Sequence, residues 1–207
     1  MHKILDFQKL RTTEVNNDYF PYFVADNALR EDLDTKALAN DFPDLEKGGS
    51  FLSANTDAGP SIRELISELE GEEFKTLLEN KFNLDLANSS LVTTLRGYSR
   101  KRDGQIHTDS KSKIVTILMY LNLNWQNEAH LRLLRGDSNL DDYITEIPCT
   151  MGSLVAFKVT KNCWHGFPPF EGKRLSIQMN YVHQESLKFH NLRHKLSSAL
   201  KGLFSKK

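Results

Sequence analysis

Cysteine is scarce in this chain: its 207 residues contain two, Cys149 and Cys163. Two cysteines cannot build the disulfide framework that holds small secreted domains together. No apolar run reaches the roughly 18 residues that a membrane span requires. The N-terminal segment carries Asp6 and Glu14 where a signal peptide would have an apolar core. We therefore expect a soluble, cytoplasmic protein with reduced thiols and no transmembrane segment.

Net charge is also absent. Lys plus Arg and Asp plus Glu both number 27, so the chain as a whole has no electrostatic preference for nucleic acid or membranes. A hydrophobic content of 39% predicts a folded globule, and 207 residues suffice for one sizeable core. We therefore expect residues 1–207 to form a single domain, and we expect no nucleic-acid partner.

The C-terminal segment departs from this balance. Residues 186–207 contain six Lys or Arg and no acid, and they predict a helix over about 186–205. The apolar residues at helical spacing are Leu192, Leu196, Ala199 and Leu203. The positive charge has two interpretations. It is either a solvated face, or a surface for an anionic partner such as lipid or nucleic acid.

The first part of the chain, about residues 1–88, is predicted to be mainly helical. Residues 18–24 resemble a short strand, and Asp26 is a candidate N-cap for a helix that ends near Pro43. Residues 44–60 are rich in Gly, Ser, Asn and Asp, which predicts an exposed loop.

Two further helices are predicted after this loop. Ser61 and Glu64 have the spacing of a capping box, which predicts the start of the first helix. Gly71 separates two groups of apolar residues at helical spacing and predicts a break between two helices. These groups are Ile62, Leu65, Ile66 and Leu69, then Phe74, Leu77, Leu78 and Phe82.

The periodicity changes near residue 89. β-Branched or alternating segments follow one another without intervening helices over about residues 89–184, which predicts an antiparallel sandwich or barrel. The segments are residues 91–99, 113–123, 130–136, 152–159 and 174–182. The predicted fold class is therefore α+β and mainly β, with helices before the sheet and one helix after it.

Three residues carry the strongest chemical signal. Residues i and i+2 of a strand share a face, so His107 and Asp109 can bind one metal ion together. His165, from a distant strand, completes a set of two histidines and one carboxylate. That set leaves half of an octahedron open and suits non-haem Fe(II). Arg174 is a basic residue nine positions after His165, and this spacing strengthens the interpretation of the three residues as a metal site.

Each of these residues also has an ordinary structural interpretation. Asp103-Gly104 is a turn signal, so His107 and Asp109 by themselves could be a turn pair. Arg174 by itself could be a surface arginine on a strand. His130 stands at a strand start and is a rival metal ligand, although no H-x-D geometry accompanies it.

Taken in order, these motifs resemble the Fe(II)/2-oxoglutarate dioxygenase superfamily, and most closely its prolyl-hydroxylase-like branch. The resemblance covers residues 91–182 and rests on GYSRKRDGQIHTDSKSKIVTILMYLNLNW, HLRLL, GSLVAFKVTKNCWHGFPPF and KRLSIQMNYV. It implies a double-stranded β-helix, a cupin-like jelly roll, supported by N-terminal helices. It also implies Fe(II), 2-oxoglutarate and O2 as cofactors, and it is compatible with ascorbate as a further cofactor.

The resemblance implies a role for each matching residue. His107, Asp109 and His165 match the iron ligands, which makes them the catalytic set. Arg174 matches the residue that pairs with the distal carboxylate of 2-oxoglutarate, and its guanidinium can do so through two parallel hydrogen bonds. Ser176 shares a strand face with Arg174 and can donate to the same carboxylate. The other expected contacts with the cosubstrate are Tyr98, Tyr120, Leu118, Leu131 and Leu133.

The implied reaction is oxidative decarboxylation of 2-oxoglutarate to succinate and CO2, coupled to hydroxylation of a second substrate. Asp109 favours hydroxylation, because superfamily members that halogenate have a small residue in its place. The substrate stays open between a protein side chain such as prolyl, an amino acid and a sugar-linked metabolite. We expect residues 44–60 and Arg100-Lys101-Arg102 to flank the pocket mouth. The alternative is a non-catalytic jelly-roll protein that binds or senses a metal or an organic acid.

Overall fold

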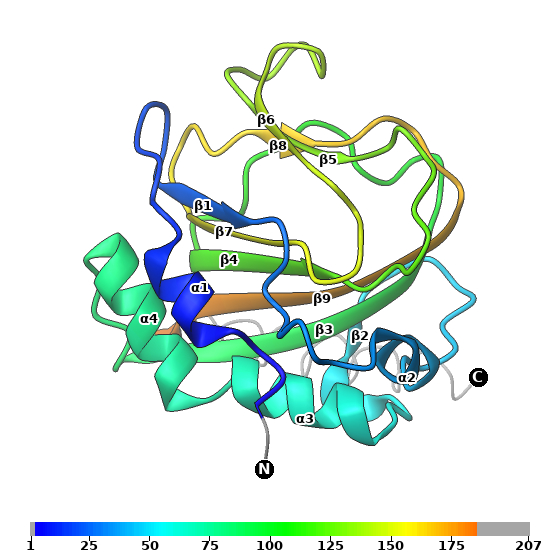
Figure 1. Ribbon diagram of the computed structural model, residues 1–207. Coiled ribbons are helices and arrows are strands. Elements are labelled where there is room, and N and C mark those ends of the chain that lie inside the picture. Colours follow the sequence, from blue (N-terminus) through cyan, green and yellow to red (C-terminus); the bar gives the residue numbers. More distant parts are fainter. Residues whose placement is uncertain (1–2, 186–207) are drawn as a thin grey trace, which may run out of the picture.

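Two antiparallel sheets face each other in the computed structural model of the chain, which describes residues 3–185 (Figure 1). The larger sheet has the strand order β1-β7-β4-β9-β3-β2, and the smaller sheet has the order β6-β5-β8. This arrangement confirms the predicted mainly β jelly roll. The C-terminal helix predicted over 186–205 lies outside the described residues.

The predicted β segments correspond to long strands of both sheets. The larger sheet contains β1 (Tyr22–Ala25), β7 (Leu154–Lys158), β4 (Lys113–Tyr120), β9 (Gly172–His183), β3 (Ser89–Ser99) and β2 (Phe51–Leu52). The smaller sheet contains β6 (Tyr143–Ile147), β5 (Leu131–Leu134) and β8 (His165–Gly166). The sequence did not predict β6, and it indicated β8 only as the strand of the second histidine. β6 lies at a sheet edge with an exposed start, and β8 is two residues long, so neither has a clear hydrophobic alternation.

The helices precede the central strands and pack below the larger sheet. They are α1 (Phe7–Thr12), α2 (Thr35–Asn40), the 3-10 helix η1 (Ser53–Asn55), α3 (Pro60–Leu69) and α4 (Glu72–Phe82). Figure 1 shows α1, α3 and α4 on the side of the larger sheet that faces away from the smaller one. The predicted break at Gly71 is confirmed, because α3 ends at Leu69 and α4 begins at Glu72.

Two predicted helix starts are wrong. Asp26 caps no helix; instead Asp34 begins α2, where its Oδ1 accepts from the N–H groups of Lys36 and Ala37 at 3.0 and 3.1 Å. The segment after Asp26 stays extended because Leu29 forms a β-bridge with Leu5.

The predicted capping box is also replaced by a tertiary contact. The N–H and hydroxyl of Ser61 both donate to Asp41 Oδ2 at 2.7 Å, and α3 starts at Pro60, two residues before the start that an N-cap at Ser61 would give. Proline suits that position because the first helical N–H has no partner within the helix. The predicted loop at 44–60 is only partly a loop, since it contains β2 and η1.

Strand alternation on β4 separates two apolar layers. Ile117 and Met119 belong to the core between the helices and the larger sheet. Leu118 and Tyr120 point the other way, into the core between the two sheets. Successive strand side chains point to opposite faces, so one strand serves both layers. The residues that carry chemistry lie on the second of these faces.

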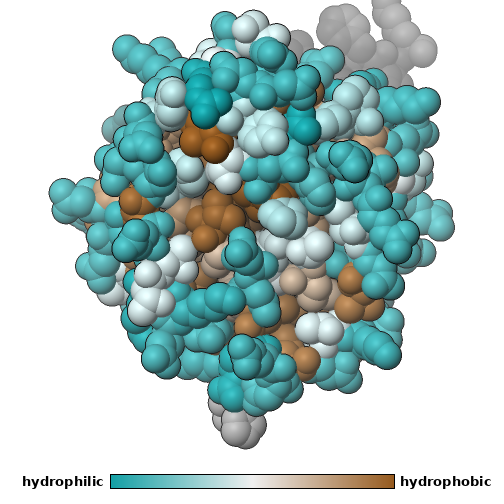
Figure 2. All heavy atoms as spheres, turned by 45° about the horizontal axis from the view of Figure 1, so that its top comes forward, coloured by the Kyte–Doolittle hydropathy of each residue, from teal (hydrophilic) through white to brown (hydrophobic). Residues whose placement is uncertain are grey.

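The face of the molecule shown in Figure 2 is largely hydrophilic. Viewed with the top of Figure 1 turned forward, apolar side chains show in the hollows of this face and hydrophilic side chains surround them (Figure 2). Within residues 3–185, no helix combines the length and the apolar character needed to cross a bilayer.

Candidate active site

His107 and His165 are brought together by a β-bridge between distant segments. Each backbone N–H donates to the carbonyl oxygen of the other residue at 3.0 Å, and the two imidazole rings have centroids 4.3 Å apart. Asp109 lies beyond the bridge, outside any strand, so the expected continuous strand face is wrong in detail. The three side chains nevertheless converge, with their ligand atoms within 4.8 Å of one another.

A glycine turn positions the segment before His107. Gly104 has a φ of 79°, a left-handed conformation that favours glycine. Its carbonyl oxygen accepts from the N–H of Phe167 at 2.9 Å, and a Cβ at this position would come within 2.6 Å of the Phe167 ring. The Asp103-Gly104 turn therefore ties the segment of the first histidine to that of the second.

Backbone carbonyls set the tautomer of both histidines. Nδ1 of His107 lies 2.7 Å from the carbonyl oxygen of Gln105, and Nδ1 of His165 lies 2.9 Å from that of Cys163. A carbonyl oxygen can only accept, so Nδ1 must carry the proton in each ring. Nε2 is then free to bind a metal ion, which is the usual arrangement of metal-binding histidines. Burial lowers the pKa of His165 to about 4, which keeps it in the neutral, metal-binding form.

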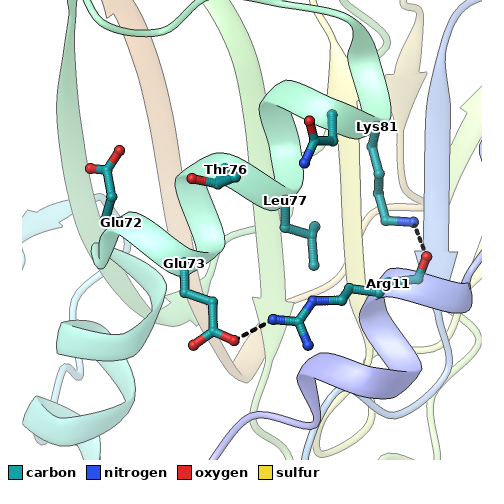
Figure 3. A pocket seen from close by; sticks show the side chains of 7 residues that line it. Arg11, Glu72, Glu73, Thr76, Leu77 and Lys81 are labelled. Atoms are coloured by element: carbon teal, nitrogen blue, oxygen red, sulfur yellow. Dashed lines mark hydrogen bonds and ion pairs between the residues drawn. The ribbon is translucent and has the colours of Figure 1, made fainter.

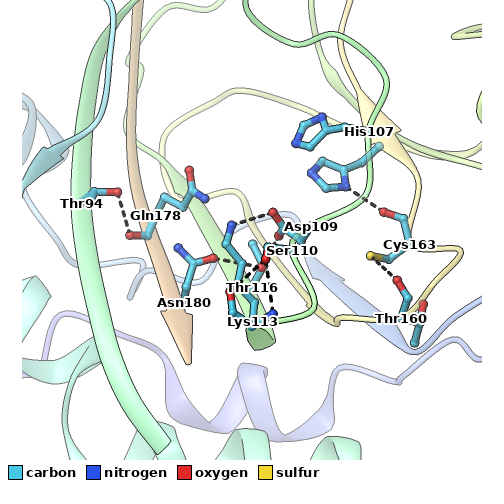
Figure 4. Close-up of polar contacts among 12 residues, drawn as sticks. Thr94, His107, Asp109, Ser110, Lys113, Thr116, Thr160, Cys163, Gln178 and Asn180 are labelled. Carbon is cyan, nitrogen blue, oxygen red and sulfur yellow. Dashed lines mark hydrogen bonds and ion pairs between the residues drawn. The ribbon is translucent and has the colours of Figure 1, made fainter. Parts of the chain in front are cut away.

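Asp109 is held by side chains of β4 (Figure 4). Lys113 Nζ donates to its Oδ1 at 2.6 Å, and the hydroxyl of Thr116 donates to its Oδ2. Burial by itself raises the pKa of Asp109, but the charge of Lys113 and these hydrogen bonds outweigh it and hold that pKa below its usual range. The carboxylate is therefore ionised and its orientation is restrained, as a metal ligand requires.

Thr116 gives a first prediction about this support. Thr116→Val keeps the shape of the side chain and removes the hydroxyl that orients Asp109. We expect Fe(II) or Mn(II) affinity to fall about 10–100-fold, the usual effect of losing a group that orients a metal ligand. Thr93→Val is the matched control, because the Thr93 hydroxyl is buried and has no hydrogen-bond partner. Calorimetric metal titrations that give equal affinities for the two variants would contradict the orienting role.

The triad opens into a cavity of about 300 Å³ between the two sheets. Residues of β3, β4, β5 and β9 form its walls, and the three converging ligands lie at its surface. Its volume is at the lower end of the range of small-molecule sites. The cavity can therefore hold a small organic molecule beside a metal ion.

Arg174 reaches this cavity from β9 with its guanidinium almost fully buried, at 8% exposure. Its Nη2 donates to the hydroxyl of Tyr120 at 3.1 Å, and its guanidinium carbon lies 3.8 Å from the centroid of the Phe167 ring. Nε is buried without any hydrogen-bond partner, and among residues 3–185 no carboxylate forms an ion pair with Arg174. A buried guanidinium with a free donor fits an incoming carboxylate.

The family comparison agrees with this chemistry. The family model described as the 2OG-Fe(II) oxygenase superfamily matches residues 93–182, the segment that supplies all three converging ligands and Arg174. Residues 93–182 are therefore similar to the 2OG-Fe(II) oxygenase superfamily. Members act with Fe(II), 2-oxoglutarate and O2, and the triad and the buried guanidinium fit the first two. No curated protein is significantly similar to the chain in sequence.

Solved structures of several prolyl hydroxylases share the fold. A prolyl-4-hydroxylase of Pseudomonas putida is 18% identical, with a TM-score of 0.56 over 86% of this chain and 91% of that one. A prolyl 4-hydroxylase of Phytophthora capsici is 15% identical, with a TM-score of 0.57 over 89% and 68%. A viral collagen prolyl hydroxylase of Paramecium Bursaria Chlorella virus-1 is 14% identical, with a TM-score of 0.55 over 80% and 96%. At these identities the likeness concerns the fold.

The cavity of about 300 Å³ beside the triad, hereafter the oxygenase cavity, is lined by most of the residues that the sequence predicted to contact the cosubstrate. Leu118, Tyr120, Leu131 and Ser176 all line it. Leu133 is fully buried nearby but does not line the cavity. Residues 44–60 contribute Ser50 to the lining, while the Arg100-Lys101-Arg102 segment contributes none and is followed by the lining residue Asp103.

Tyr98 does not line the main cavity. It borders an adjoining void of about 20 Å³, which Arg174 and Ser176 also border. The pairing of β3 with β9 shifts between Arg96 and Tyr98, so that Arg96 lies opposite Ser176 whereas Tyr98 lies opposite Lys173. Tyr98 borders this small void together with Arg96, and of the two residues it is Arg96 that also lines the main cavity.

Five polar residues that line the oxygenase cavity were not predicted as site residues from the sequence: Arg96, Asp103, Lys113, Thr116 and Gln178. Arg96 could have been predicted from the sequence, because it stands two residues before Tyr98 on the same predicted strand and so shares its face. Thr116 and Gln178 are polar positions within otherwise apolar strands, which is a weaker signal. Lys113 had none, because its contact with Asp109 depends on the path of the loop between them.

Two rival sites do not have this chemistry. His130 lies away from the triad, and its Nδ1 accepts from the N–H of Cys149 at 3.4 Å. A cavity of about 470 Å³ lies between α1 and α4 (Figure 3). Its charged groups already have partners, since Arg11 pairs with Glu73 and Lys81 donates to the carbonyl oxygen of Arg11 at 3.2 Å.

Proposed function

We propose that this oxygenase hydroxylates its substrate at a site built from His107, Asp109, His165 and Arg174. One observation carries the proposal: the three converging ligand atoms and the anion-free, buried guanidinium of Arg174 face the same cavity. The histidines and Asp109 would hold Fe(II), and Arg174 would hold the distal carboxylate of 2-oxoglutarate. When bound, the iron and 2-oxoglutarate supply the oxidising chemistry with O2, and succinate and CO2 are released.

The residues of the chain position the reactants and exclude water. The Nδ1 hydrogen bonds of both histidines keep their Nε2 atoms aimed at one point. Arg174 and the buried Tyr120 hydroxyl form the polar end of the cosubstrate pocket, and Ser176 adds a further donor. Leu118 and Leu131 supply apolar walls that keep this part of the cavity dry.

The test does not require knowledge of the substrate. Such enzymes turn over slowly without substrate, so anaerobic protein with Fe(II) and 2-oxoglutarate should develop a weak visible charge-transfer band, and air should then produce succinate. Asp109→Ala should suppress the succinate, because two histidines alone would hold the iron. Fully iron-loaded wild-type protein that forms neither the band nor succinate would instead support the alternative of a binding or sensing protein.

Several finer points belong to this proposal. A Trichoplax adhaerens prolyl hydroxylase with the same fold was solved with a peptide, so a protein side chain is one substrate class to consider. A cytoplasmic location agrees with the free thiols of Cys149 and Cys163 and stays a prediction. The lack of a nucleic-acid partner and the organisation of residues 1–207 as one domain also stay predictions.

A further inference from the structure

Arg96 is a second arginine at the oxygenase cavity. It projects from β3 and lies directly opposite Ser176 of β9, which in turn lies opposite Tyr120 of β4. Cross-strand partners share a face of the sheet, so these three side chains form one row along the cavity floor. Arg96 is partly buried and lines the cavity together with Arg174. Burial lowers the pKa of Arg96, and the nearby charge of Arg174 lowers it further.

The guanidinium of Arg96 has no hydrogen-bond or ion-pair partner in the part of the chain that the structure describes. Asp103 is the nearby acid that acts on its charge, but Asp103 is engaged elsewhere. Its Oδ1 accepts from Arg100 Nη2 at 2.9 Å, and its Oδ2 accepts from the backbone N–H of Arg100 at 2.9 Å. A guanidinium always carries its charge, so Arg96 places a free cation at the cavity.

The cosubstrate does not account for this cation. In the proposed function, 2-oxoglutarate has one carboxylate at the iron and the other at Arg174. The walls assigned to the cosubstrate, Leu118 and Tyr120, lie on β4, whereas Arg96 lies on β3, on the other side of β9. Phe51 of β2 pairs with Leu95 of β3, so Arg96 borders the side of the cavity near Ser50, as well as the small void beside Arg174 and Ser176. We assign the side near Ser50 to the second substrate.

We infer that Arg96 binds a carboxylate of the primary substrate, so that the enzyme hydroxylates a small carboxylic acid of the size of a free amino acid. This inference rests on the proposed function and deepens it. A single guanidinium matches the single charge of a carboxylate and can bind it through two hydrogen bonds. The cavity of about 300 Å³ must hold both reactants, which limits the part of the second substrate that enters it to about the size of an amino acid.

The experiment uses the full chain loaded with Mn(II) and 2-oxoglutarate without O2. The probes are the proteinogenic amino acids, each supplied as the free acid and as its carboxamide, and the readout is relaxation of their protons by the bound Mn(II). At least one free acid should show relaxation in the wild type while its carboxamide does not. Arg96→Gln should weaken that binding by at least about tenfold. Arg96→Lys should retain part of it, because the charge survives without the planar fork.

Two controls separate the alternatives. Arg102→Gln removes an exposed positive charge from the same turn region without touching the cavity, and it should bind the acid like the wild type. Arg96→Gln should keep its affinity for 2-oxoglutarate within about twofold. A loss of 2-oxoglutarate binding would move Arg96 into the cosubstrate clamp and overturn the inference. Relaxation by no free acid, or equal relaxation by acid and carboxamide, would overturn it too. Wild-type protein that fails to bind Mn(II) and 2-oxoglutarate would contradict the proposed function itself.

Discussion

Replacing His107 by alanine is expected to abolish the binding of about one Fe(II) or Mn(II) per chain. The free Nε2 of His107 points into the set of converging ligand atoms, and two remaining ligands are too few to hold a divalent ion firmly. His107 is the better choice than His165, because it is exposed while His165 is buried at 5% exposure. The exposed substitution leaves no cavity, so the fold should persist. Metal content and calorimetric titration measure the effect.

The control for this variant is His130→Ala. His130 is another histidine near the β domain, but it lies outside the group of converging ligands. Its removal should leave metal stoichiometry unchanged, and both variants should melt close to the wild type. Full metal stoichiometry in the His107 variant would remove the triad from the site.

Replacing Arg174 by leucine is expected to weaken 2-oxoglutarate binding by well over tenfold while metal binding stays intact. The guanidinium is buried and its Nε lacks a partner, so a bound carboxylate would depend on it for charge and hydrogen bonds. Losing one partner of a buried charge pair typically costs about 2–5 kcal/mol. Titration of the metal-loaded protein with 2-oxoglutarate measures the change.

Arg132→Leu is the matched control for this clamp. Arg132 is also a strand arginine with little exposure, but its guanidinium already pairs with Glu146 and Asp141. It should leave the 2-oxoglutarate affinity near that of the wild type. The clamp would be refuted if Arg174→Leu bound the cosubstrate as tightly as Arg132→Leu. Arg174→Lys should have an intermediate affinity for 2-oxoglutarate, because the positive charge remains but the paired N–H donors of the guanidinium are lost.

Local patterns could predict most of the strands and the two main helices, because they record which face of each element is buried. The alternation on β4 between Ile117 and Leu118 is one example, and the break at Gly71 is another. The helix starts failed where a distant group competed with the local one. Asp41 binds the Ser61 N–H that the predicted capping box would have used, and no local pattern contains that contact.

For the candidate site, too, some residues could be predicted from the sequence and others could not. Residue type and order identify His107, Asp109, His165 and Arg174, because few side chains can bind iron or form two parallel hydrogen bonds with a carboxylate. The face that each strand residue presents was less secure. Arg96 lines the main cavity and Tyr98 does not, although the two residues stand two positions apart on β3. The pairing of β3 with β9 is irregular between them, and that irregularity depends on two strands far apart in the chain.

By itself, therefore, the sequence determined the fold class, the likeness to Fe(II)/2-oxoglutarate dioxygenases and the chemistry of the candidate ligands, since these depend on periodicity and residue type. Only the tertiary structure decided that Lys113 and Thr116 hold Asp109 and that Arg174 is buried with a free donor. It also decided that Arg96 lines the cavity without a partner. These properties arise from distances between side chains on different segments, which local sequence patterns do not encode.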